Sequence, residues 1–545
     1  MDFGFCKNRK PKIENQSKKM DFITENLLTI LILLPAFGAL AVLGHAMFWK
    51  QESGLKWITL GFTLVSFLIS LLLLADSAKL SANGFYFEKN ITWIKAINTN
   101  YHVGVDGLSL WLVLLTTFIM PIAILSTWRA VEKRHTAFYI FLLLLQSAMI
   151  GVFVSLDLLV FYLFFEASLV PMFFLIGIWG GENRIYAAVK FFIFTALGSL
   201  LMLVAIIGLY YLHANATGAG TFDYVVLLNS LKAGNLIFET GTGALLFFAF
   251  ALAFSIKVPL FPFHTWLPDA HTEAPTAGSV ILAAVLLKMG TYGIMRFCFN
   301  LFPEASREYA WIFIILAIIG IIYGALVAMV QPDIKRLVAY SSVAHMGFVI
   351  LGMFSFTEMG MQGALYIMLA HGITTGALFL LVGFIYERRH TRMITEYGGI
   401  SSIMPIYATL FVITTMASIG LPFLNGFVGE FLAMVGMWKS TSVAHPWIAT
   451  MLAGTGVIFA AVYLLWMVQR VFFGKLTNSK NKNLQDLSWR EIGLMVPLLF
   501  LMVYMGVYPA PILNRSKDSI ISIENRVTKQ TGGSFEKVET KNKDH

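Results

Sequence analysis

Long apolar segments follow one another almost from end to end of this 545-residue chain. A segment of roughly 20 apolar residues is long enough for a helix to cross the hydrocarbon layer of a membrane. Because 58% of the residues are hydrophobic and only 13% are charged, a water-soluble fold could not bury so much apolar surface. The sequence therefore predicts an integral membrane protein made of helices, since the strands of a membrane barrel would be about half as long and would alternate.

We expect an all-α polytopic fold of about fourteen transmembrane helices. The twelfth apolar segment is too long for one straight crossing. The approximate ranges are 25–47, 55–76, 107–127, 136–155, 157–179, 184–212, 241–263, 274–298, 310–330, 336–355, 361–386, 402–438, 450–472 and 489–509.

Polar segments lie at both ends of the apolar region. The extension 1–24 carries a basic cluster that would resist transfer across the membrane, so we expect Met20 to be the true first residue, a hypothesis that N-terminal sequencing would test. The tail 510–545 is rich in lysine and in acidic residues, and we expect little fixed structure in it from about Arg515.

The net charge of +9 is spread through short loops and not gathered on one face, so it does not indicate a nucleic-acid partner. Most loop cations follow odd-numbered spans, among them Arg134, Arg184, Lys335 and Arg388, whereas few, such as Arg296, follow even-numbered spans. Positive residues favour the cytoplasmic side. We therefore expect the odd-numbered loops in the cytoplasm and both termini outside.

Several common site types are excluded by the residues present. Cys6 and Cys298 are the only cysteines, so neither a disulfide framework nor a cluster held by four thiolates is expected. The glycines of "ETGTGALL", 239–246, follow no strand and lack the third glycine of a dinucleotide loop, so they indicate a helix start. The chain has no P-loop and no zinc-spaced Cys/His cluster. We expect no cofactor or metal in this chain.

Two blocks of the chain resemble one another. "SIKVPLF" at 255–261 matches "SIGLPFL" at 418–424, and Asp157 corresponds to Asp333. The sequence therefore predicts helices 1–3 in 25–135, a first repeat of helices 4–8 in 136–298, a second of helices 9–13 in 310–472, and helix 14 in 489–509. Because each repeat has five spans, the two are inverted relative to one another.

Prolines interrupt the corresponding helices 7 and 12 of the two repeats. Pro259 leaves the carbonyl of Ser255 without its helical partner, and Pro422 does the same to Ser418. Free carbonyls at this depth are tolerated only beside protein or in a water-filled cavity. An ordinary proline kink is the alternative at either place, but two matching breaks favour a polar cavity.

Ionisable side chains also lie deep within the predicted spans. A charge near the bilayer centre costs roughly 2.5–3.5 kcal/mol on insertion scales. The alternatives to function are a structural ion pair, a lysine that reaches a headgroup, and packed histidines, but most of these positions lie too deep for a headgroup to be reached easily. We interpret the set as a proton relay, since burial and a nearby carboxylate shift the pKa of a lysine in opposite directions. The residues are Glu166, Lys257, Lys288, His345, His371 and Glu430.

Lys190 lies nearer a helix end, so its role is left open between function and structure. The basic group Arg388, Arg389, His390 and Arg392 is interpreted as an orienting loop.

The segment "FHTWLPDAHTEAPTAGSVILAAVLLKMGTYGIMRF", 263–297, resembles the signature of the antiporter-like membrane subunits of respiratory complex I, NADH:quinone oxidoreductase. Its detail is similar to the type called subunit M in bacteria and subunit 4 in mitochondria. "LLVFYLFFEASLVPMFFLIGIWG", "QPDIKRLVAYSSVAHMGFVILG" and "GLPFLNGFVGEFL" extend the resemblance over nearly all of 25–510. The first nineteen residues fit no part of the family pattern.

The resemblance implies roles for the deep charges. In this family a fifth-span glutamate pairs with a seventh-span lysine, which correspond here to Glu166 and Lys257. An eighth-span lysine is central, and it corresponds to Lys288. A charged group in span twelve leads to the outer half-channel, and it corresponds to Glu430. His345 and His371 fall where the family places polar links between the half-channels. Glutamate at the twelfth span, where sibling subunits have lysine, points to the subunit M type.

The resemblance also implies outward proton transport coupled to quinone reduction, as a non-redox subunit of a translocase. NADH, FMN, iron-sulfur clusters and quinone are then expected in partner subunits. The expected partners are the other membrane-arm subunits, especially the two sibling antiporter-like subunits, and the lipid bilayer. The expected location is the inner (plasma) membrane of a bacterial cell, in preference to a mitochondrial or plastid membrane.

Two other functions compete with this one. A subunit of a multi-chain Na+/H+ antiporter would share the repeat, the span-five glutamate and the span-seven lysine. A structural scaffold would use the buried charges only as pairs.

Overall fold

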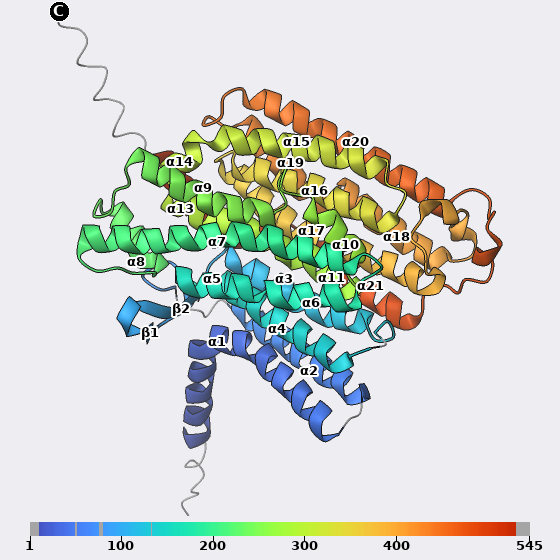
Figure 1. The fold of residues 1–545 in the computed structure, drawn as a ribbon, viewed down its shortest axis with the longest axis horizontal. Coiled ribbons are helices and arrows are strands. Elements are labelled where there is room, and N and C mark those ends of the chain that lie inside the picture. Colours follow the sequence, from blue (N-terminus) through green and yellow to red (C-terminus); the bar gives the residue numbers. More distant parts are fainter. Residues whose placement is uncertain (1–9, 50–51, 76–79, 132, 530–545) are drawn as a thin grey trace, which may run out of the picture.

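Long helices run side by side along one direction in the computed structural model, which describes residues 10–49, 52–75, 80–131 and 133–529 (Figure 1). Twelve described helices are long and apolar enough to cross a membrane, by length and composition. Two of them are buried throughout their most apolar windows, Thr276–Leu301 and Glu358–Arg389. The core of the protein therefore lies around these two spans, and the prediction of a polytopic helical membrane protein is confirmed.

The helices of the first half have the following bounds: α1 (Lys10–Phe48), α2 (Glu52–Ser70), α3 (Ser109–Ser126), α4 (His135–Val154), α5 (Leu158–Ala167), α6 (Leu169–Trp179), α7 (Arg184–Thr217), α8 (Tyr224–Lys232), α9 (Thr240–Lys257), α10 (Trp266–Glu273), α11 (Thr276–Ile281), α12 (Leu287–Gly293), α13 (Phe299–Leu301) and α14 (Pro303–Glu308). Two π-helical segments, η3 (Leu282–Leu286) and η4 (Ile294–Cys298), join α11, α12 and α13 into one span.

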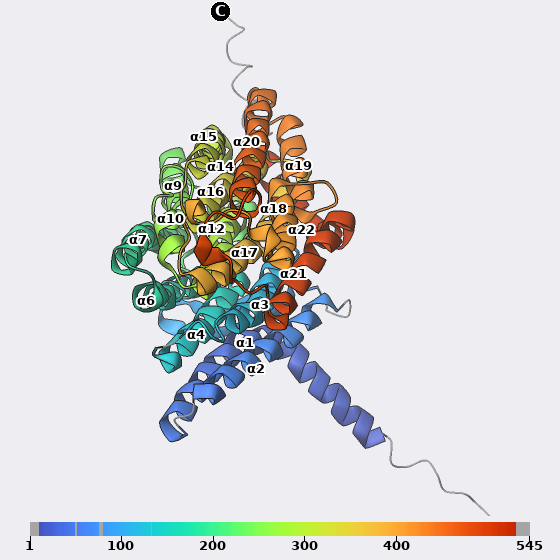
Figure 2. The same ribbon diagram turned by 90° about the vertical axis from the view of Figure 1, so that its right-hand side faces the viewer.

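The second half contains α15 (Ala310–Met329), α16 (Ile334–Met353), α17 (Glu358–Arg389), α18 (Pro405–Ile419), α19 (Asn425–Trp438), α20 (Pro446–Phe472), α21 (Trp489–Val507) and α22 (Ala510–Lys529). Seen at right angles to the first view, α1 and α2 lie together on one side of the bundle, and the N-terminal part of α1 extends away from it (Figure 2).

Both predicted interruptions are present. The seventh span ends as α9 at Lys257 and resumes as α10, and the twelfth ends as α18 at Ile419 and resumes as α19. As expected, the Ser255 carbonyl has no helical partner at position 259, and it accepts a hydrogen bond from the backbone N–H of Leu260 at 2.8 Å instead. The wider turn that follows the break supplies the partner which Pro259 cannot provide.

Asp157 and Asp333, which correspond in the predicted repeat, have the same local structural role. Each caps the N-terminus of a helix, α5 or α16, and its carboxylate accepts hydrogen bonds from two backbone N–H groups. Each also forms a short antiparallel bridge to a later loop, Asp157 with Asp223 and Asp333 with Met393. These paired caps agree with the register of the repeat, whose boundaries stay predictions.

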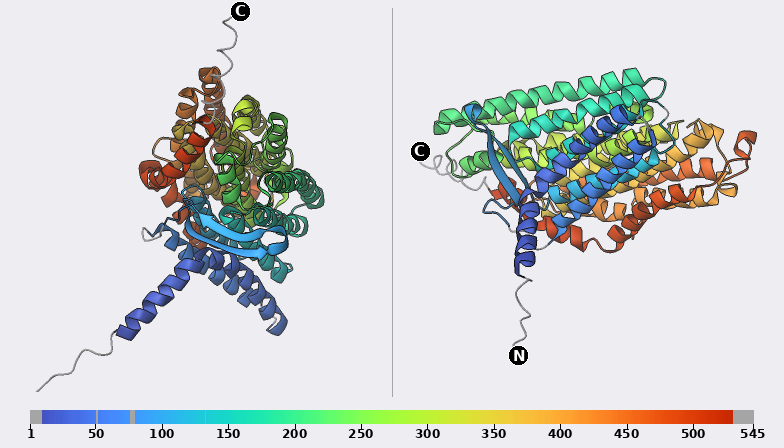
Figure 3. Two further views of the ribbon diagram at one scale, coloured as in Figure 1. Left: turned by 90° about the vertical axis from the view of Figure 1, so that its left-hand side faces the viewer. Right: turned by 90° about the horizontal axis from the view of Figure 1, so that it is seen from below.

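A β-hairpin that the sequence analysis did not predict lies across one end of the bundle (Figure 3). Its strands are β1 (Tyr86–Ile94) and β2 (Thr99–Val105), paired antiparallel. The fold is therefore helical apart from this one sheet in the described residues. The two strands lie between long apolar segments, and the search for membrane-length apolar segments did not detect them.

The tail is more ordered than expected over its first part. Residues 510–529 form α22, where Ser519 accepts a hydrogen bond from the backbone N–H of Gly107 at 3.0 Å and Arg526 donates to the Asn300 carbonyl at 3.2 Å. The expectation of little structure from Arg515 is wrong for this part. The rest of the tail, 530–545, lies outside the described residues. The side chain of Met20, the predicted first residue, is not among those described either.

Several residues assigned to orienting loops are structural instead. Lys335 is 7% exposed and donates to the Ala274 carbonyl, and Arg296 is buried in η4 against Asp106. Arg388 binds both carboxylate oxygens of Glu491 at 2.7 Å. These cations have partners on other elements, which charge counting along the sequence could not show, and the orientation inferred from that counting stays a prediction.

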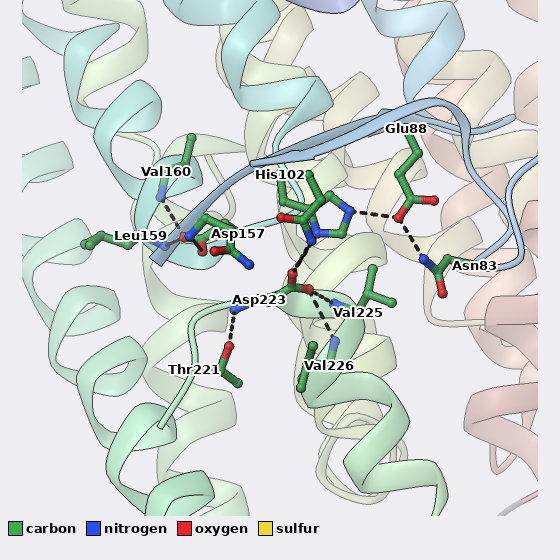
Figure 4. A network of polar contacts seen from close by, with 12 residues as sticks. Asn83, Glu88, His102, Asp157, Leu159, Val160, Thr221, Asp223, Val225 and Val226 are labelled. Atoms are coloured by element: carbon green, nitrogen blue, oxygen red, sulfur yellow. Dashed lines mark hydrogen bonds and ion pairs between the residues drawn. The ribbon is translucent and has the colours of Figure 1, made fainter. Parts of the chain in front are cut away.

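A buried polar network holds the hairpin to the bundle (Figure 4). His102 of β2 is 1% exposed, and its Nδ1 lies 2.8 Å from Asp223 Oδ2 while its Nε2 lies 2.8 Å from Glu88 Oε1. Asp223 caps α8, and Asp157 caps α5 and accepts from the backbone N–H of Asn100 at 3.0 Å. The hairpin is thereby fixed to the starts of two helices.

The charges in this network alter one another's pKa. Burial alone would lower the pKa of His102, but the hydrogen bonds and charges of Asp223 and Glu88 outweigh it and raise the pKa. Burial alone would raise the pKa of Asp223, but the hydrogen bond and charge of His102 outweigh burial, so the pKa of Asp223 is lowered. Burial raises the pKa of Asp157 to about 6.

The hairpin should be most stable at mildly acidic pH. The contribution of His102 is complete below its ordinary pKa of about 6.5 and is lost as the pH rises through its raised value. Asp157, also raised, loses its contribution as the pH rises through about 6, whereas Asp223 loses its own as the pH falls through its lowered pKa. Hydrogen exchange of 86–105 in the native protein, corrected for intrinsic rates, should show greatest protection at about pH 4–5 and falling protection as the pH rises through about 6.

His102→Gln is the matched variant, since it keeps two polar ends without the charge. We expect it to weaken protection of the hairpin at pH about 5 by about 1–3 kcal/mol and to flatten the decline above pH 6. Protection that does not change with pH, or a variant with the same pH profile as the native chain, would contradict this account.

Candidate functional site

The break between α9 and α10 places Lys257 inside the protein. It is the last residue of α9 and is 2% exposed. Its ammonium lies 5.1 Å from the centroid of the Phe165 ring and 5.6 Å from that of Phe191. Aromatic faces offset part of the cost of removing a cation from water. The lysine is therefore held at the end of a helix, and no carboxylate of the described residues forms an ion pair with it.

Glu166, the predicted partner of Lys257, lies on the neighbouring helix α5 and is half-buried. The two charges interact electrostatically, yet they form no direct ion pair. A movement of either side chain would change this interaction, because the attraction between two charges depends on their separation and is stronger where water is excluded. The geometry thus allows the glutamate to control whether the lysine keeps its proton.

Lys288 lies at the centre of the molecule, wholly buried in α12. Its Nζ donates to the Ala283 carbonyl at 2.5 Å and lies 2.8 Å from Nδ1 of His371, which is on α17. Ala283 belongs to the π-helical segment η3, and such segments are frequent at functional sites. A single proton can lie on either nitrogen of the Lys288–His371 pair, depending on the tautomer of the histidine.

His345 and Glu430 form a second buried pair. Nδ1 of His345, on α16, lies 2.8 Å from Oε1 of Glu430, on α19, and both side chains are about 7% exposed. Ser418, at the end of α18, lies 3.5 Å from the other ring nitrogen of His345. The break in the twelfth span therefore brings a serine and a carboxylate to the same histidine.

The two pairs face one another across a small cavity. The rings of His371 and His345 have centroids 5.9 Å apart. A cavity of about 20 Å3 is lined by both histidines, Glu430, Ser418 and Thr374, among others. Its size fits one water molecule, and Nε2 of His371 has no hydrogen-bond partner among the described residues. Lys288, His371, His345 and Glu430 thus form a line with room for one bridging water.

Lys257 and Lys288 are not joined by a direct polar contact in the described part of the chain. The end of α9 packs closely on α12 instead, at Gly290, where a Cβ would lie 2.6 Å from the carbonyl oxygen of Phe254 and 3.0 Å from the amide nitrogen of Val258. The predicted set of six residues is thus arranged as a pair, Glu166 and Lys257, and a line of four.

Sequence reasoning missed several polar residues near this line. His271 on α10 is wholly buried, its ring stacks on Phe379 at 4.6 Å, and neither ring nitrogen has a partner in the described structure. The position of His271 just after a helix break, within the motif 263–297, could have identified it as a candidate site residue. Lys190, left open above, forms an ion pair with Asp269 at 2.7 Å, which favours a structural role.

The comparisons with known proteins bear on this geometry. A family model described as NADH:quinone oxidoreductase/Mrp antiporter matches residues 155–460, which include all six predicted site residues. NADH-quinone oxidoreductase subunit M of Rhodobacter capsulatus is 47% identical over 495 residues, which cover 89% of this chain and 94% of that protein. This chain belongs to the NADH-quinone oxidoreductase subunit M family.

Other members of the family agree. Subunit M of Rickettsia prowazekii is 43% identical over 92% of this chain and 99% of that protein, and NADH-ubiquinone oxidoreductase chain 4 of Marchantia polymorpha is 42% identical over 91% and 96%. The predicted resemblance is confirmed. The match to subunit M over almost the whole chain does not favour the Na+/H+ antiporter alternative.

Two solved structures share the fold. A chain of respiratory complex I from Thermus thermophilus with bound NADH superposes with a TM-score of 0.80 at 33% identity, covering 92% of this chain and 99% of that one. An archaeal membrane-bound sulfane sulfur reductase gives a TM-score of 0.78 at 20% identity, with the same coverage, and indicates the fold alone. Membership of complex I follows, with other complex I subunits as partners.

Gly290 offers a test of the packing beneath the site. Gly290→Ala should force α9 away from α12, because its Cβ would meet backbone atoms and not a flexible side chain. We expect a loss of about 1–3 kcal/mol in stability, and reduced proton transport from the displaced Lys257. Gly454→Ala on α20 is the control, since no atom lies within 4 Å of its added Cβ. Equal thermal stability of the two variant complexes would show that the contact is unimportant.

Proposed function

We propose that this chain moves protons outward across the membrane as a non-redox subunit of NADH:quinone oxidoreductase. The observation that carries the proposal is the buried line of Lys288, His371, His345 and Glu430, with a distance of 2.8 Å in each of its two pairs. Each buried ionisable group costs several kcal/mol unless it is paired or functional. In this proposal, the pairs Lys288–His371 and His345–Glu430 consist of an amine, two imidazoles and a carboxylate, all of which can gain and lose a proton.

In our proposal, protons pass between these groups in the sequence in which the contacts link them. Lys288 passes its proton to Nδ1 of His371, and the proton on Nε2 of that ring leaves toward the cavity. His345 receives a proton from the cavity side and gives one from Nδ1 to Glu430. Each histidine gains and loses one proton, so charge moves along the line, and each ring then returns to its first tautomer by rotation.

Glu166 and Lys257 act as the loading pair in this proposal. When the carboxylate approaches, the lysine retains its proton, and when the carboxylate withdraws, burial favours proton loss. A proton or a change in charge at Lys257 would then alter the field at Lys288, because α9 and α12 are in contact. The coupling between the two lysines is electrostatic, in keeping with the lack of a direct hydrogen bond.

The driving energy comes from outside this chain. Each proton moves against about 2.3 kcal/mol per 100 mV of membrane potential. We assign NADH, FMN, the iron-sulfur clusters and quinone to partner subunits, and we expect the redox-linked drive to reach this chain through neighbouring subunits, especially the two sibling antiporter-like subunits. We place the protein in the bacterial inner membrane.

Neutral lysine variants test the relay. In membrane vesicles that contain the assembled complex, Lys288→Met and Lys257→Met should lower NADH-driven proton uptake to less than about one tenth, because a positioned proton-transfer group typically contributes at least 100-fold. Lys475→Met, at an exposed loop lysine, is the control. Normal uptake in the two buried variants, with assembly verified on a native gel, would favour the scaffold alternative.

Co-purification separates the complex I function from the antiporter. The chain isolated in mild detergent should carry flavin and iron-sulfur subunits with it. Recovery with small antiporter subunits alone, together with sodium-driven proton movement in vesicles, would contradict our assignment.

A further inference from the structure

A cationic cavity lies at the end of the bundle opposite the β-hairpin, far from the proton line. It has a volume of about 590 Å3, and Lys133, Arg134, Trp179 and Arg184 are among its lining residues. Arg134 directly precedes α4, Trp179 ends α6, and Arg184 begins α7. Three apolar spans therefore end or begin at this cavity, which puts it at the depth of the lipid headgroups.

Three cations line this cavity. Lys133, Arg134 and Arg184 are all exposed, and none forms an ion pair with a carboxylate in the described residues. Their positions are held by the backbone: the indole N–H of Trp179 donates to the Lys133 carbonyl at 2.7 Å, and Arg184 donates to the Gly181 carbonyl at 3.1 Å. The loop before α4 is thus tied to the end of α6, which keeps the positive charges together.

An apolar track leads from the same cavity along the outside of α7. Ile185 lines the cavity and is 62% exposed. Val189 and Ile193 follow at intervals of four residues and are 42% and 57% exposed. Residues spaced by four lie on one face of a helix. A molecule with an anionic head and an apolar chain would place the head among the cations and the chain along this face.

We propose that this cavity binds the phosphodiester headgroup of an anionic membrane phospholipid, with an acyl chain lying along α7. Basic pockets between transmembrane helices are a known mode of anionic lipid recognition, and arginine pairs well with phosphate oxygens. Trp179 suits the boundary between headgroup and hydrocarbon, where aromatic rings collect. The proposal does not depend on the proton relay, because no residue is shared with it.

Photo-crosslinking identifies the occupant. The intact complex would carry a photoreactive phenylalanine analogue in place of Ile185, in nanodiscs of phosphatidylcholine that contain a minor share of phosphatidylglycerol. We expect phosphatidylglycerol to be labelled well above its share of the lipid. The same analogue at Ile406, which is 44% exposed at the start of α18, is the positional control and should label the lipids in proportion.

Charge removal then tests the recognition. The triple change Lys133→Gln, Arg134→Asn and Arg184→Gln should reduce the preference for phosphatidylglycerol by about tenfold or more, since each cation near an anionic surface contributes to binding. Asn suits position 134 because its φ is 54°. The matched control replaces three exposed cations of another loop, Lys475, Lys480 and Lys482, by Gln and should keep the preference.

Two outcomes would overturn the proposal. Labelling at Ile185 in proportion to the two lipids would show an ordinary lipid contact. Crosslinking to another protein chain would show that the cavity belongs to a subunit interface. Assembly of each variant, measured on a native gel, separates loss of binding from loss of folding.

Discussion

The cost of a charge within the membrane is the constraint on which this structure depends. Lys257, Lys288, His345, His371 and Glu430 are all 6% exposed or less. Their positions are stable because each faces a compensating group on another helix: a carboxylate, an imidazole or an aromatic ring. The helices are therefore held in a particular arrangement by the same polar contacts that can carry protons.

Helix interruption supplies the polar environment. The break after Lys257 turns the chain so that the lysine ends a helix, and the break after Ile419 brings Ser418 and Glu430 toward one histidine. The π-helical segment η3 frees the Ala283 carbonyl for Lys288. Each departure from regular helix thus places a donor or an acceptor at a depth where water is scarce.

The end of the bundle that carries the hairpin shows how polar contacts replace apolar packing outside the apolar spans. The hairpin is held there by His102 between two carboxylates and by two helix-capping aspartates. At the opposite end, Arg388 and Glu491 connect two helices, whereas Lys133, Arg134 and Arg184 keep their charges available. At the same end of the bundle, Arg388 is paired with a carboxylate, whereas the cations that line the proposed lipid cavity have no carboxylate partner among the described residues.

The sequence by itself determined the helical membrane fold, the two broken helices and five of the buried ionisable residues, because length, hydropathy, proline and charge act locally along the chain. Only the tertiary structure decided which of those residues meet. Lys288 and His371 are 83 positions apart, and His345 and Glu430 are 85. It also decided that Lys335 and Arg296 are buried, that residues 510–529 are helical, and that the hairpin exists. These features depend on partners distant in sequence, whose approach is set by helix packing and not by any local pattern.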